Sequence, residues 1–295
     1  MKVSCHVCSS NRIVQYRKEN NHQILSCRDC HLLFLESDES SFNKVNDKEN
    51  QDSNSEFKED YWGEITRQSE ENNARYLATH KYFVNRIIGL FPRKTPINLI
   101  DLGSGFGFFV SRACRAGIDA AGLDTSKKAT MYGQNQLGLK NLFCTSLAEH
   151  AAMNKSYRVV TAFNFLEHVN VESIIDMYKL VEPSGYVLLR IPNASFHRFF
   201  HRVLCAFGLE HKIPHSVLAT KPPSHLYGFS RKNLNILLEN VGFIEIQICP
   251  SPLSDSLNRF NYRNLVSFIS RFVYIVSSKK ISISPTIYII AKKPA

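Results

Sequence analysis

The spacing of apolar residues follows two different periods along most of the chain. Residues 64–90 carry large apolar side chains at helical intervals, and Pro92 and Pro96 follow them. This pattern predicts a helix that ends before the first proline. Beyond it, short apolar runs typical of buried strands alternate with helical segments. The predicted strands are 97–102, 120–123, 142–145, 158–163, 185–191, 243–249 and 285–291, and the predicted helices are 108–116, 126–136, 173–181, 231–240 and, irregularly, 256–277.

This order of elements predicts an α/β fold. Helices that join apolar strands form right-handed βαβ units around a mainly parallel, doubly wound sheet. Three segments depart from the pattern. Residues 1–35 form a cysteine-bearing unit, 36–60 are almost entirely polar, and 194–229 are rich in His, Phe, Arg and Pro. We expect a small module at 1–35, a polar linker at 36–60 and a main domain at 61–295, with a lid-like insertion at 194–229.

The stretch IDLGSGFGFF, residues 100–109, joins a predicted strand to a predicted helix. Glycines at such a turn allow a ligand to approach the main chain closely. A nicotinamide dinucleotide requires G-x-G-x-x-G, but Phe108 stands where the third glycine is needed. An acid at the strand end, Asp101, would also repel a pyrophosphate. The loop therefore favours a ligand with a cationic head group over a dinucleotide.

S-adenosylmethionine carries such a head group, and the chain supplies acids for both of its polar ends. Asp101 can hold the ammonium side by charge-assisted hydrogen bonding. Asp124 ends the next predicted strand, in AAGLDTS, at the usual position of an acid that accepts the two ribose hydroxyls. The strand–loop–helix–strand placement makes the signal specific.

These motifs resemble those of the class I S-adenosylmethionine-dependent methyltransferases. Further matching stretches are VVTAFNFLEHV, LVEPSGYVLLRIPN, HLYGFS, NVGF and PTIYIIAKK, and two of them resemble the branch that includes small-molecule and sugar methyltransferases. The resemblance implies a seven-stranded, mainly parallel doubly wound sheet with an antiparallel last strand. It also implies that the cofactor-binding residues are Asp101, Gly103, Gly105, Asp124, Thr125, Leu147 and Asn164.

Two CxxC pairs, CHVC and CRDC, lie in the first 35 residues. Their separation is that of the two knuckles of a zinc ribbon, in which four thiolates surround one tetrahedral metal. A unit of this size cannot build a sufficient core without a metal. We expect a structural zinc, with His6 and His31 as solvent-facing neighbours. The predicted ligands are Cys5, Cys8, Cys27 and Cys30.

Two histidines lie at the predicted ligand edge of the sheet. His168 follows the fourth strand of the main domain, and His225 precedes the helix at 231–240. A methyltransferase that acts on a hydroxyl or an acidic carbon needs a base. We expect His225, or otherwise His168, to face the acceptor, while Glu167 orders the loop and Tyr61 closes over the cofactor.

The charge of the chain is unevenly distributed. The net charge is +10, but residues 1–60 hold 8 Lys/Arg against 11 Asp/Glu, and residues 186–295 hold 14 against 4. With Arg198, Arg202 and Lys212 in the insertion, this favours an anionic small-molecule acceptor, such as a sugar or a nucleotide-linked sugar. RNA is an alternative acceptor, and a non-catalytic cofactor-binding scaffold is a third hypothesis. The sequence does not fix the oligomeric state.

The N-terminus lacks an apolar signal segment, and the longest apolar runs are too short to span a bilayer. We expect a cytoplasmic protein without a transmembrane segment. The four remaining cysteines lie in apolar surroundings, which predicts reduced thiols in the core. They are Cys114, Cys144, Cys205 and Cys249.

Overall fold

The computed structural model describes most of the predicted elements. The predicted linker beyond Glu36, Tyr61 and Lys212 lie outside the described part of the chain. The described residues are 3–19, 22–36, 74–209, 218, 225–252, 262–277 and 283–295.

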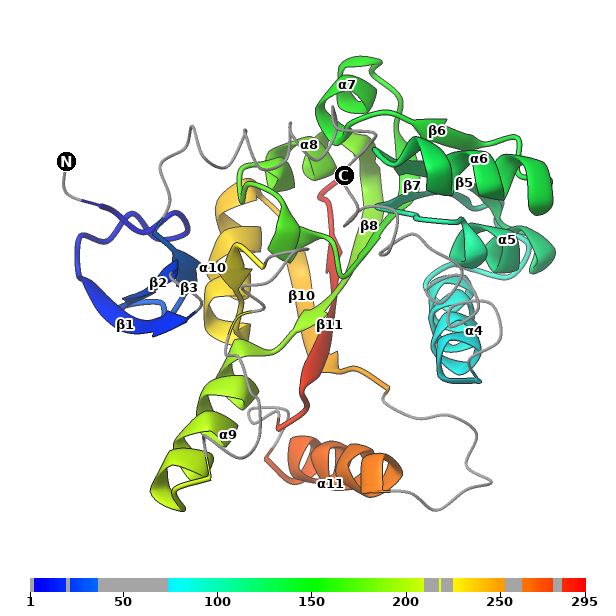
Figure 1. The fold of residues 1–295 in the computed structure, drawn as a ribbon. Helices are drawn as coiled ribbons and strands as arrows, with labels where there is room; N and C mark the ends of the chain where they lie inside the picture. Colours follow the sequence, from blue (N-terminus) through cyan, green and yellow to red (C-terminus); the bar gives the residue numbers. More distant parts are fainter. Residues whose placement is uncertain are drawn as a thin grey trace.

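A seven-stranded sheet forms the centre of the molecule, in the order β10-β11-β8-β7-β4-β5-β6 (Figure 1). Its five strands from β4 to β8 pair in parallel, and β11 is antiparallel to both β8 and β10. The predicted fold class is confirmed. The strands are β4 (Asn98–Leu102), β5 (Asp119–Asp124), β6 (Leu142–Cys144), β7 (Tyr157–Phe163), β8 (Val181–Pro192), β10 (Ile244–Pro250) and β11 (Thr286–Lys292).

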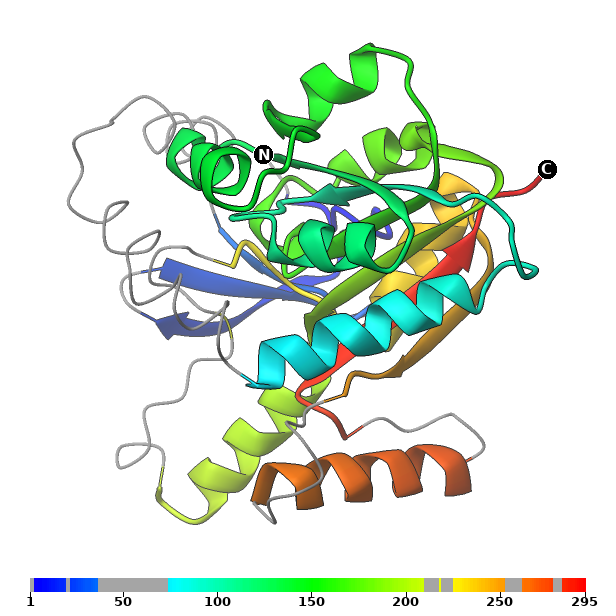
Figure 2. The same ribbon diagram turned by 90° about the vertical axis from the view of Figure 1, so that its right-hand side faces the viewer.

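Helices cover both faces of this sheet because its strands are apolar on both sides. Along β4, Leu99 packs into a cluster with Phe83 and Phe109, whereas Ile100 and Leu102 pack into a cluster on the opposite face. Figure 2 shows α4 lying across the first of these faces. That side carries α4 (Ala74–Ile88), α5 (Phe108–Arg115) and α6 (Lys127–Gln136), and the other carries α7 (Leu147–Ala152), α8 (Ser173–Leu180) and α10 (Arg231–Val241).

Two further helices, α9 (Ala194–Ala206) and α11 (Tyr262–Val276), lie side by side beyond one end of the sheet (Figures 1 and 2). Both expose large apolar side chains, among them Phe199 and Phe268. Within the described residues, no helix combines the length and apolar character required to cross a membrane.

Strand β8 is longer than the sequence predicts. It begins at Val181, which pairs with Tyr157 ahead of an irregularity in the register. Ser184 adopts a left-handed φ of 61° within this stretch, and its N–H donates to the Pro294 carbonyl at 3.0 Å. The backbone bend at Ser184, which would normally interrupt the strand, is therefore stabilised by its hydrogen bond to Pro294, and strand pairing continues beyond the bend.

The N-terminal residues form a separate antiparallel sheet of four strands. Three of them are β1 (Ile13–Glu19), β2 (His22–Cys27) and β3 (Leu33–Leu35), and the fourth, β9 (Tyr227–Gly228), comes from the predicted insertion. In the register, Leu33 lies opposite Gly228. A Cβ atom on Gly228 would lie 2.7 Å from Leu218 Cδ2 and 3.0 Å from Leu33 Cβ. The close pairing of β3 and β9 thus requires glycine at this position.

The N-terminal sheet also packs against α10, and together they extend the core of the main domain (Figure 1). Phe34 is 1% exposed and belongs to the same cluster as Leu234 and Leu237 of α10. Three side chains of this helix bond to the N-terminal backbone: Asn240 donates to the Val7 carbonyl at 3.1 Å, Asn233 to the Cys30 carbonyl at 3.5 Å, and Lys232 Nζ to the Asp29 carbonyl at 2.5 Å.

The prediction that the isolated cysteines are core thiols is wrong for three of the four. Cys114, Cys144 and Cys205 are exposed, and Cys249 is half-buried. Cys114 and Cys205 lie on amphipathic helices, where apolar neighbours in the sequence face the core while the cysteine faces solvent. Neighbours in sequence are therefore a poor guide to burial on a helix.

Gly107 begins α5 with a left-handed φ of 80°, and an added Cβ would lie 2.8 Å from both Leu139 and Leu142. We predict that Gly107→Ala destabilises the protein by roughly 2–4 kcal/mol, through backbone strain and overpacking together. Gly138→Ala is the matched control, because Gly138 has a φ of 67° but an added Cβ there would meet no heavy atom within 4 Å. Thermal unfolding should show the larger loss for Gly107; equal losses would contradict the packing argument.

Candidate active site

The loop between β4 and α5 turns through three glycines in the left-handed region. Their φ values are 67° at Gly103, 54° at Gly105 and 80° at Gly107. The Ser104 N–H within the loop donates to the Leu123 carbonyl of β5 at 2.9 Å. This hydrogen bond anchors the loop to the neighbouring strand. Because every second residue from 103 to 107 is a glycine without a side chain, a ligand can contact the main-chain atoms of the loop.

Asp124 lies at the end of β5 and closes the same loop. Its Oδ2 accepts from the Gly105 N–H at 2.9 Å, and its Oδ1 accepts from the Ser126 N–H at 2.8 Å. The side chain is buried; desolvation raises its pKa, and the two backbone N–H groups oppose that rise. Each oxygen retains a second lone-pair direction, so the carboxylate is oriented to accept from two further donors, such as the hydroxyls of a diol.

Asp101 is held at the end of β4 by a neighbouring strand. Its Oδ1 accepts from Thr161 Oγ1 of β7 at 2.6 Å, and the residue is 4% exposed. The sequence pattern alone did not indicate Thr161, although this residue lies in the VVTAF run. A short hydrogen bond to a carboxylate is charge-assisted and fixes the direction of the acid.

Two further predicted cofactor positions, Thr125 and Leu147, lie near the end of β5 in the chain. Leu147 is buried at the start of α7, and Thr125, next to Asp124, is exposed. The Thr145 N–H donates to the Asp124 carbonyl at 3.2 Å, which brings the turn before α7 against the end of β5. The turn that leads into Leu147 therefore lies beside Asp124.

Asn164 directly follows β7 and has a left-handed φ of 54°, and a buried arginine on β8 orders it. Arg190 Nη1 donates to Asn164 Oδ1 at 2.9 Å, and the Asn164 N–H donates to the Arg190 carbonyl at 2.7 Å. Arg190 Nε also donates to Ser251 Oγ at 3.1 Å. The sequence contained a signal for this role, because an arginine interrupts an otherwise apolar strand.

The loop after β7 packs directly on the glycine loop. An added Cβ on Gly103 would lie 2.6 Å from Phe165 Cδ2. The next residues form a short helix, η1 (Leu166–His168). Glycine is thus required at position 103 by its φ and also by the Phe165 ring packed against it. This packing places the segment that follows Phe165 beside the glycine loop.

The structure brings both predicted catalytic histidines together with Glu167. The ring centroids of His168 and His225 are 4.8 Å apart and nearly perpendicular. One ligand atom of each, and a Glu167 carboxylate oxygen, lie within 4.8 Å of one another. Among the described residues, neither carboxylate oxygen of Glu167 has a hydrogen-bond partner, and the side chain is 1% exposed. This spacing suits proton sharing or the binding of a cation.

Burial sets the protonation of this group. Desolvation raises the pKa of Glu167 to about 8, which Arg190 only partly opposes. Desolvation, followed by the charges of His168 and His197, lowers the pKa of His225 to about 4. At neutral pH, His225 is therefore an uncharged imidazole that can accept a proton, and Glu167 is largely a protonated acid.

The four predicted metal ligands also converge. The sulfurs of Cys5, Cys8, Cys27 and Cys30 all lie within 4.8 Å of one another, with Sγ–Sγ distances of 3.4 Å for Cys5–Cys30 and 3.6 Å for Cys8–Cys27. Sulfurs at about 2.3 Å from a shared tetrahedral zinc are about 3.8 Å apart, so this set fits that metal. The two predicted bystanders, His6 and His31, are exposed.

A continuous set of backbone hydrogen bonds joins the cysteine cluster to the histidines. The Leu35 N–H of β3 donates to the Leu226 carbonyl at 3.1 Å, and the Leu226 N–H donates to the Glu167 carbonyl at 2.7 Å. His6 Nδ1 and the Tyr227 hydroxyl lie 3.0 Å apart. The segment that carries His225 is thus held between η1 and the N-terminal sheet.

A family model described as a methyltransferase domain matches residues 71–247, more than half of the chain. The sheet order and the glycine loop agree with that match. The chain belongs to the class I S-adenosylmethionine-dependent methyltransferases.

Two curated relatives of this methyltransferase are ubiquinone biosynthesis O-methyltransferases. That of Rickettsia canadensis is 23% identical over 50% of this chain and 66% of its own length, just under two thirds. That of Pelagibacter ubique is 24% identical over 60% of this chain and 75% of its own length. Among solved structures, the plantazolicin methyltransferase BpumL, in complex with a pentazolic desmethylPZN analog and SAH, has a TM-score of 0.54 at 15% identity, covering 86% of this chain and 96% of that one.

The methyltransferase domain contains a half-buried histidine, on α4, that sequence reasoning missed. His80 of α4 has its Nδ1 at 2.7 Å from Arg112 Nη1, and its ring meets Phe109 edge to face. Desolvation, with the charges of Arg112 and Arg190, lowers its pKa to about 3. A neutral His80 can accept from Arg112 and so fix α4 to α5. The pairing joins helices distant in sequence, so nothing in the local pattern pointed to it.

The buried acid beside the histidines gives a pH test. Because the pKa of Glu167 is about 8 when folded and 4.5 ordinarily, the folded state retains a proton that the unfolded state releases between these values. The contribution of Glu167 to the free energy of unfolding is therefore fully present below about pH 4.5 and is lost as the pH rises toward about 8. We predict that Glu167→Gln removes this loss.

Melting temperatures measured from pH 5 to pH 9 provide the readout. The difference between variant and parent should shift in favour of the variant as the pH rises. Glu172→Gln, which changes an exposed acid on the same loop, is the control and should follow the parent. Parallel curves for parent and Glu167→Gln would show that Glu167 is ionised in the folded protein.

Proposed function

We propose that this methyltransferase acts on a small-molecule acceptor whose hydroxyl or acidic carbon is deprotonated by His225. The observation that carries the proposal is the packing of the glycine loop against the histidine-bearing segments. Gly103 contacts Phe165, and three residues later His168 meets His225. One contiguous region can therefore hold the cofactor on one side and the acceptor on the other.

The residues at the carboxyl ends of β4, β5 and β7 are assigned to the cofactor. Asp124 is oriented to accept from the ribose hydroxyls, and Asp101 to face the ammonium group of the methionine part. When bound, S-adenosylmethionine supplies a methyl carbon already activated by its sulfonium. The proposed cofactor set is Asp101, Gly103, Gly105, Asp124, Thr125, Leu147 and Asn164.

The acceptor side needs a base that is neutral at physiological pH. His225 is neutral at that pH because burial lowers its pKa, which also makes it a weaker base than a free imidazole, and His168 stands 4.8 Å away between ring centroids as the alternative or as a partner in proton transfer. Glu167 lies behind both, buried, and orders the loop by accepting the Leu226 N–H at its carbonyl. Positioning of acceptor and cofactor supplies the rest of the acceleration.

The proposed class of acceptor is based on the charge of the chain and on the names of its curated relatives. The curated relatives are named as O-methyltransferases, which supports a hydroxyl acceptor. The basic C-terminal part of the chain supports an anionic one. A sugar or nucleotide-linked sugar with a free hydroxyl satisfies both conditions and is our preferred substrate class.

The four-cysteine cluster is assigned to a structural zinc. Its sulfurs have the separation that tetrahedral coordination requires, and three of the four cysteines are buried, which leaves no open position for catalysis. We predict about one zinc per chain by elemental analysis and its loss in Cys27→Ser with Cys30→Ser. Cys114→Ser with Cys144→Ser, which changes two of the three exposed cysteines, should keep the metal. Full zinc in the first variant would exclude the four-thiolate site.

Removal of the acid at the end of β5 tests the cofactor site. We predict that Asp124→Ala weakens S-adenosylmethionine binding by roughly 1.5–3 kcal/mol, about ten- to a hundredfold, because charged hydrogen bonds to the ribose are lost. Calorimetry measures the change. Asp119→Ala, at the exposed start of the same strand, should bind like the parent. Unchanged affinity in a folded Asp124→Ala protein would place the ribose elsewhere.

Replacement of the proposed base tests the acceptor site. We predict that His225→Gln lowers kcat by about a hundredfold or more and leaves the Kd for S-adenosylmethionine unchanged. His22→Gln, an exposed change in β2, is the control. A panel of nucleotide-linked sugars and short RNAs first identifies an acceptor by radiolabel transfer. Turnover by His225→Gln equal to that of the parent would transfer the role to His168 or to positioning alone, and methylation of RNA alone would reject the substrate class.

A further inference from the structure

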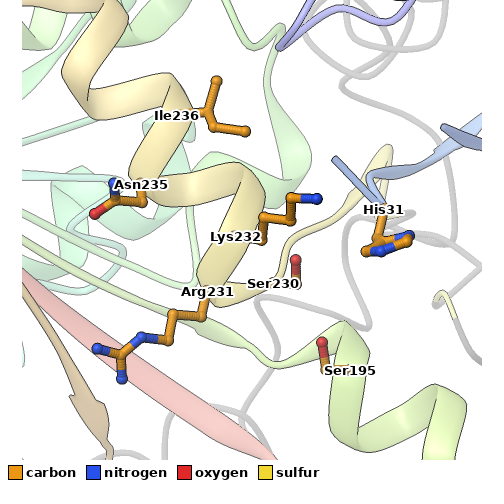
Figure 3. Close-up of a pocket in the computed structure, with 7 residues that line it drawn as sticks. All are labelled: His31, Ser195, Ser230, Arg231, Lys232, Asn235 and Ile236. Carbon is orange, nitrogen blue, oxygen red and sulfur yellow. The ribbon is translucent and has the colours of Figure 1, made fainter. Parts of the chain in front are cut away.

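An open hollow of about 470 Å³ lies where the N-terminal sheet meets the starts of α9 and α10. Its wall combines His31 from a cysteine knuckle, Ser195 from α9 and residues 230–232 from α10. Figure 3 shows Lys232 directed toward His31, with Ser230 between Lys232 and Ser195 in this view. The volume is within the range of small-molecule sites.

The hollow is positively charged. Two of the described residues that line it, Arg231 and Lys232, are cationic, and none is an acid. The nearby carboxylate of Asp29 is already paired with Arg12 at 2.7 Å. An anion entering the hollow would therefore meet a net positive charge.

Two helices also begin at this wall. The thirteen-residue α9 follows Asn193, which caps it, and the eleven-residue α10 follows Ser230. The Ala194 N–H donates to the Phe229 carbonyl at 2.7 Å, which holds the two starts together. Helix N-termini carry partial positive charge and favour bound oxyanions.

A buried hydroxyl is an independent sign of a ligand. Ser230 is 4% exposed and lines the hollow, yet its Oγ has no hydrogen-bond partner among the described residues. Its backbone N–H, in contrast, donates to Asn233 Oδ1 at 2.8 Å. A buried hydroxyl without a partner is unfavourable, and an oxyanion in the hollow would accept from it.

We propose that this hollow binds a phosphate or diphosphate group of the methyl acceptor. The inference rests on the proposed function for the identity of the acceptor, but the site itself does not depend on it. Ser230 follows His225 by five residues on one largely extended segment, which limits their separation to about 17 Å. An extended phosphorylated acceptor can place its phosphate in the hollow and its reactive hydroxyl near His225.

Calorimetric titration with sodium diphosphate at constant ionic strength tests the site directly. Saturable binding at one site per chain is expected, with Ser230→Ala and Lys232→Gln each weakening it at least fivefold. Lys179→Gln on α8 is the charge-matched control and should bind like the parent. Melting temperatures of all variants confirm folding. The absence of saturable diphosphate binding, or equal affinity in the parent and a folded double variant, would overturn the proposal.

Two further arms separate the sources of the phosphate and the two levels of inference. Uridine diphosphate should compete with diphosphate for the site. If a short single-stranded RNA binds saturably and diphosphate does not bind, the proposal is rejected in favour of a nucleic-acid surface. S-adenosylmethionine is titrated into the same samples. Diphosphate binding that is lost in the Ser230→Ala and Lys232→Gln variants supports the anion site. If Asp124→Ala or His225→Gln nevertheless behaves like the parent, only the proposed function is rejected.

Discussion

The pairing of β3 with β9 is the contact on which the acceptor side of this methyltransferase depends. A two-residue strand has little stability of its own, and β9 is stabilised because it completes a sheet whose other three strands belong to the N-terminal cysteine unit. Leu226 then bridges that sheet to Glu167 through its backbone. The cysteine cluster therefore contributes to the position of His225, although no cysteine lies in the proposed active site.

The cofactor side is stabilised by different forces. Its glycine loop lies between two central strands of the large sheet, and buried carboxylates tie it down through backbone and hydroxyl donors. Each acid is oriented before a ligand arrives, which reduces the ordering that binding requires. The two halves of the site meet where Phe165 covers Gly103. Cofactor binding and acceptor placement can thus be altered separately.

The sequence allowed the central fold and the cofactor acids to be predicted because both depend on local patterns. Apolar runs located the strands, and the acids at 101 and 124 each lie at the end of one of them. Long-range contacts left no comparable signal. Nothing near residue 227 indicated pairing with β3, and the arginine within β8 marked a buried charge but not its partner, Asn164, on the loop after β7. Cys114 and Cys205 were misassigned because apolar neighbours on a helix do not imply a buried position, and Cys144 because it ends β6, the edge strand of the large sheet.

Hydrogen exchange of the Cys27→Ser, Cys30→Ser variant, compared with the Cys114→Ser, Cys144→Ser variant, tests the central dependence most directly. The first variant disrupts the cluster and the second leaves it intact. The account predicts that peptides covering 225–229 lose protection only in the first, whereas peptides covering 98–107 stay protected in both and S-adenosylmethionine affinity is retained. Full protection of 225–229 in the first variant, with exchange confined to residues 3–35, would contradict it.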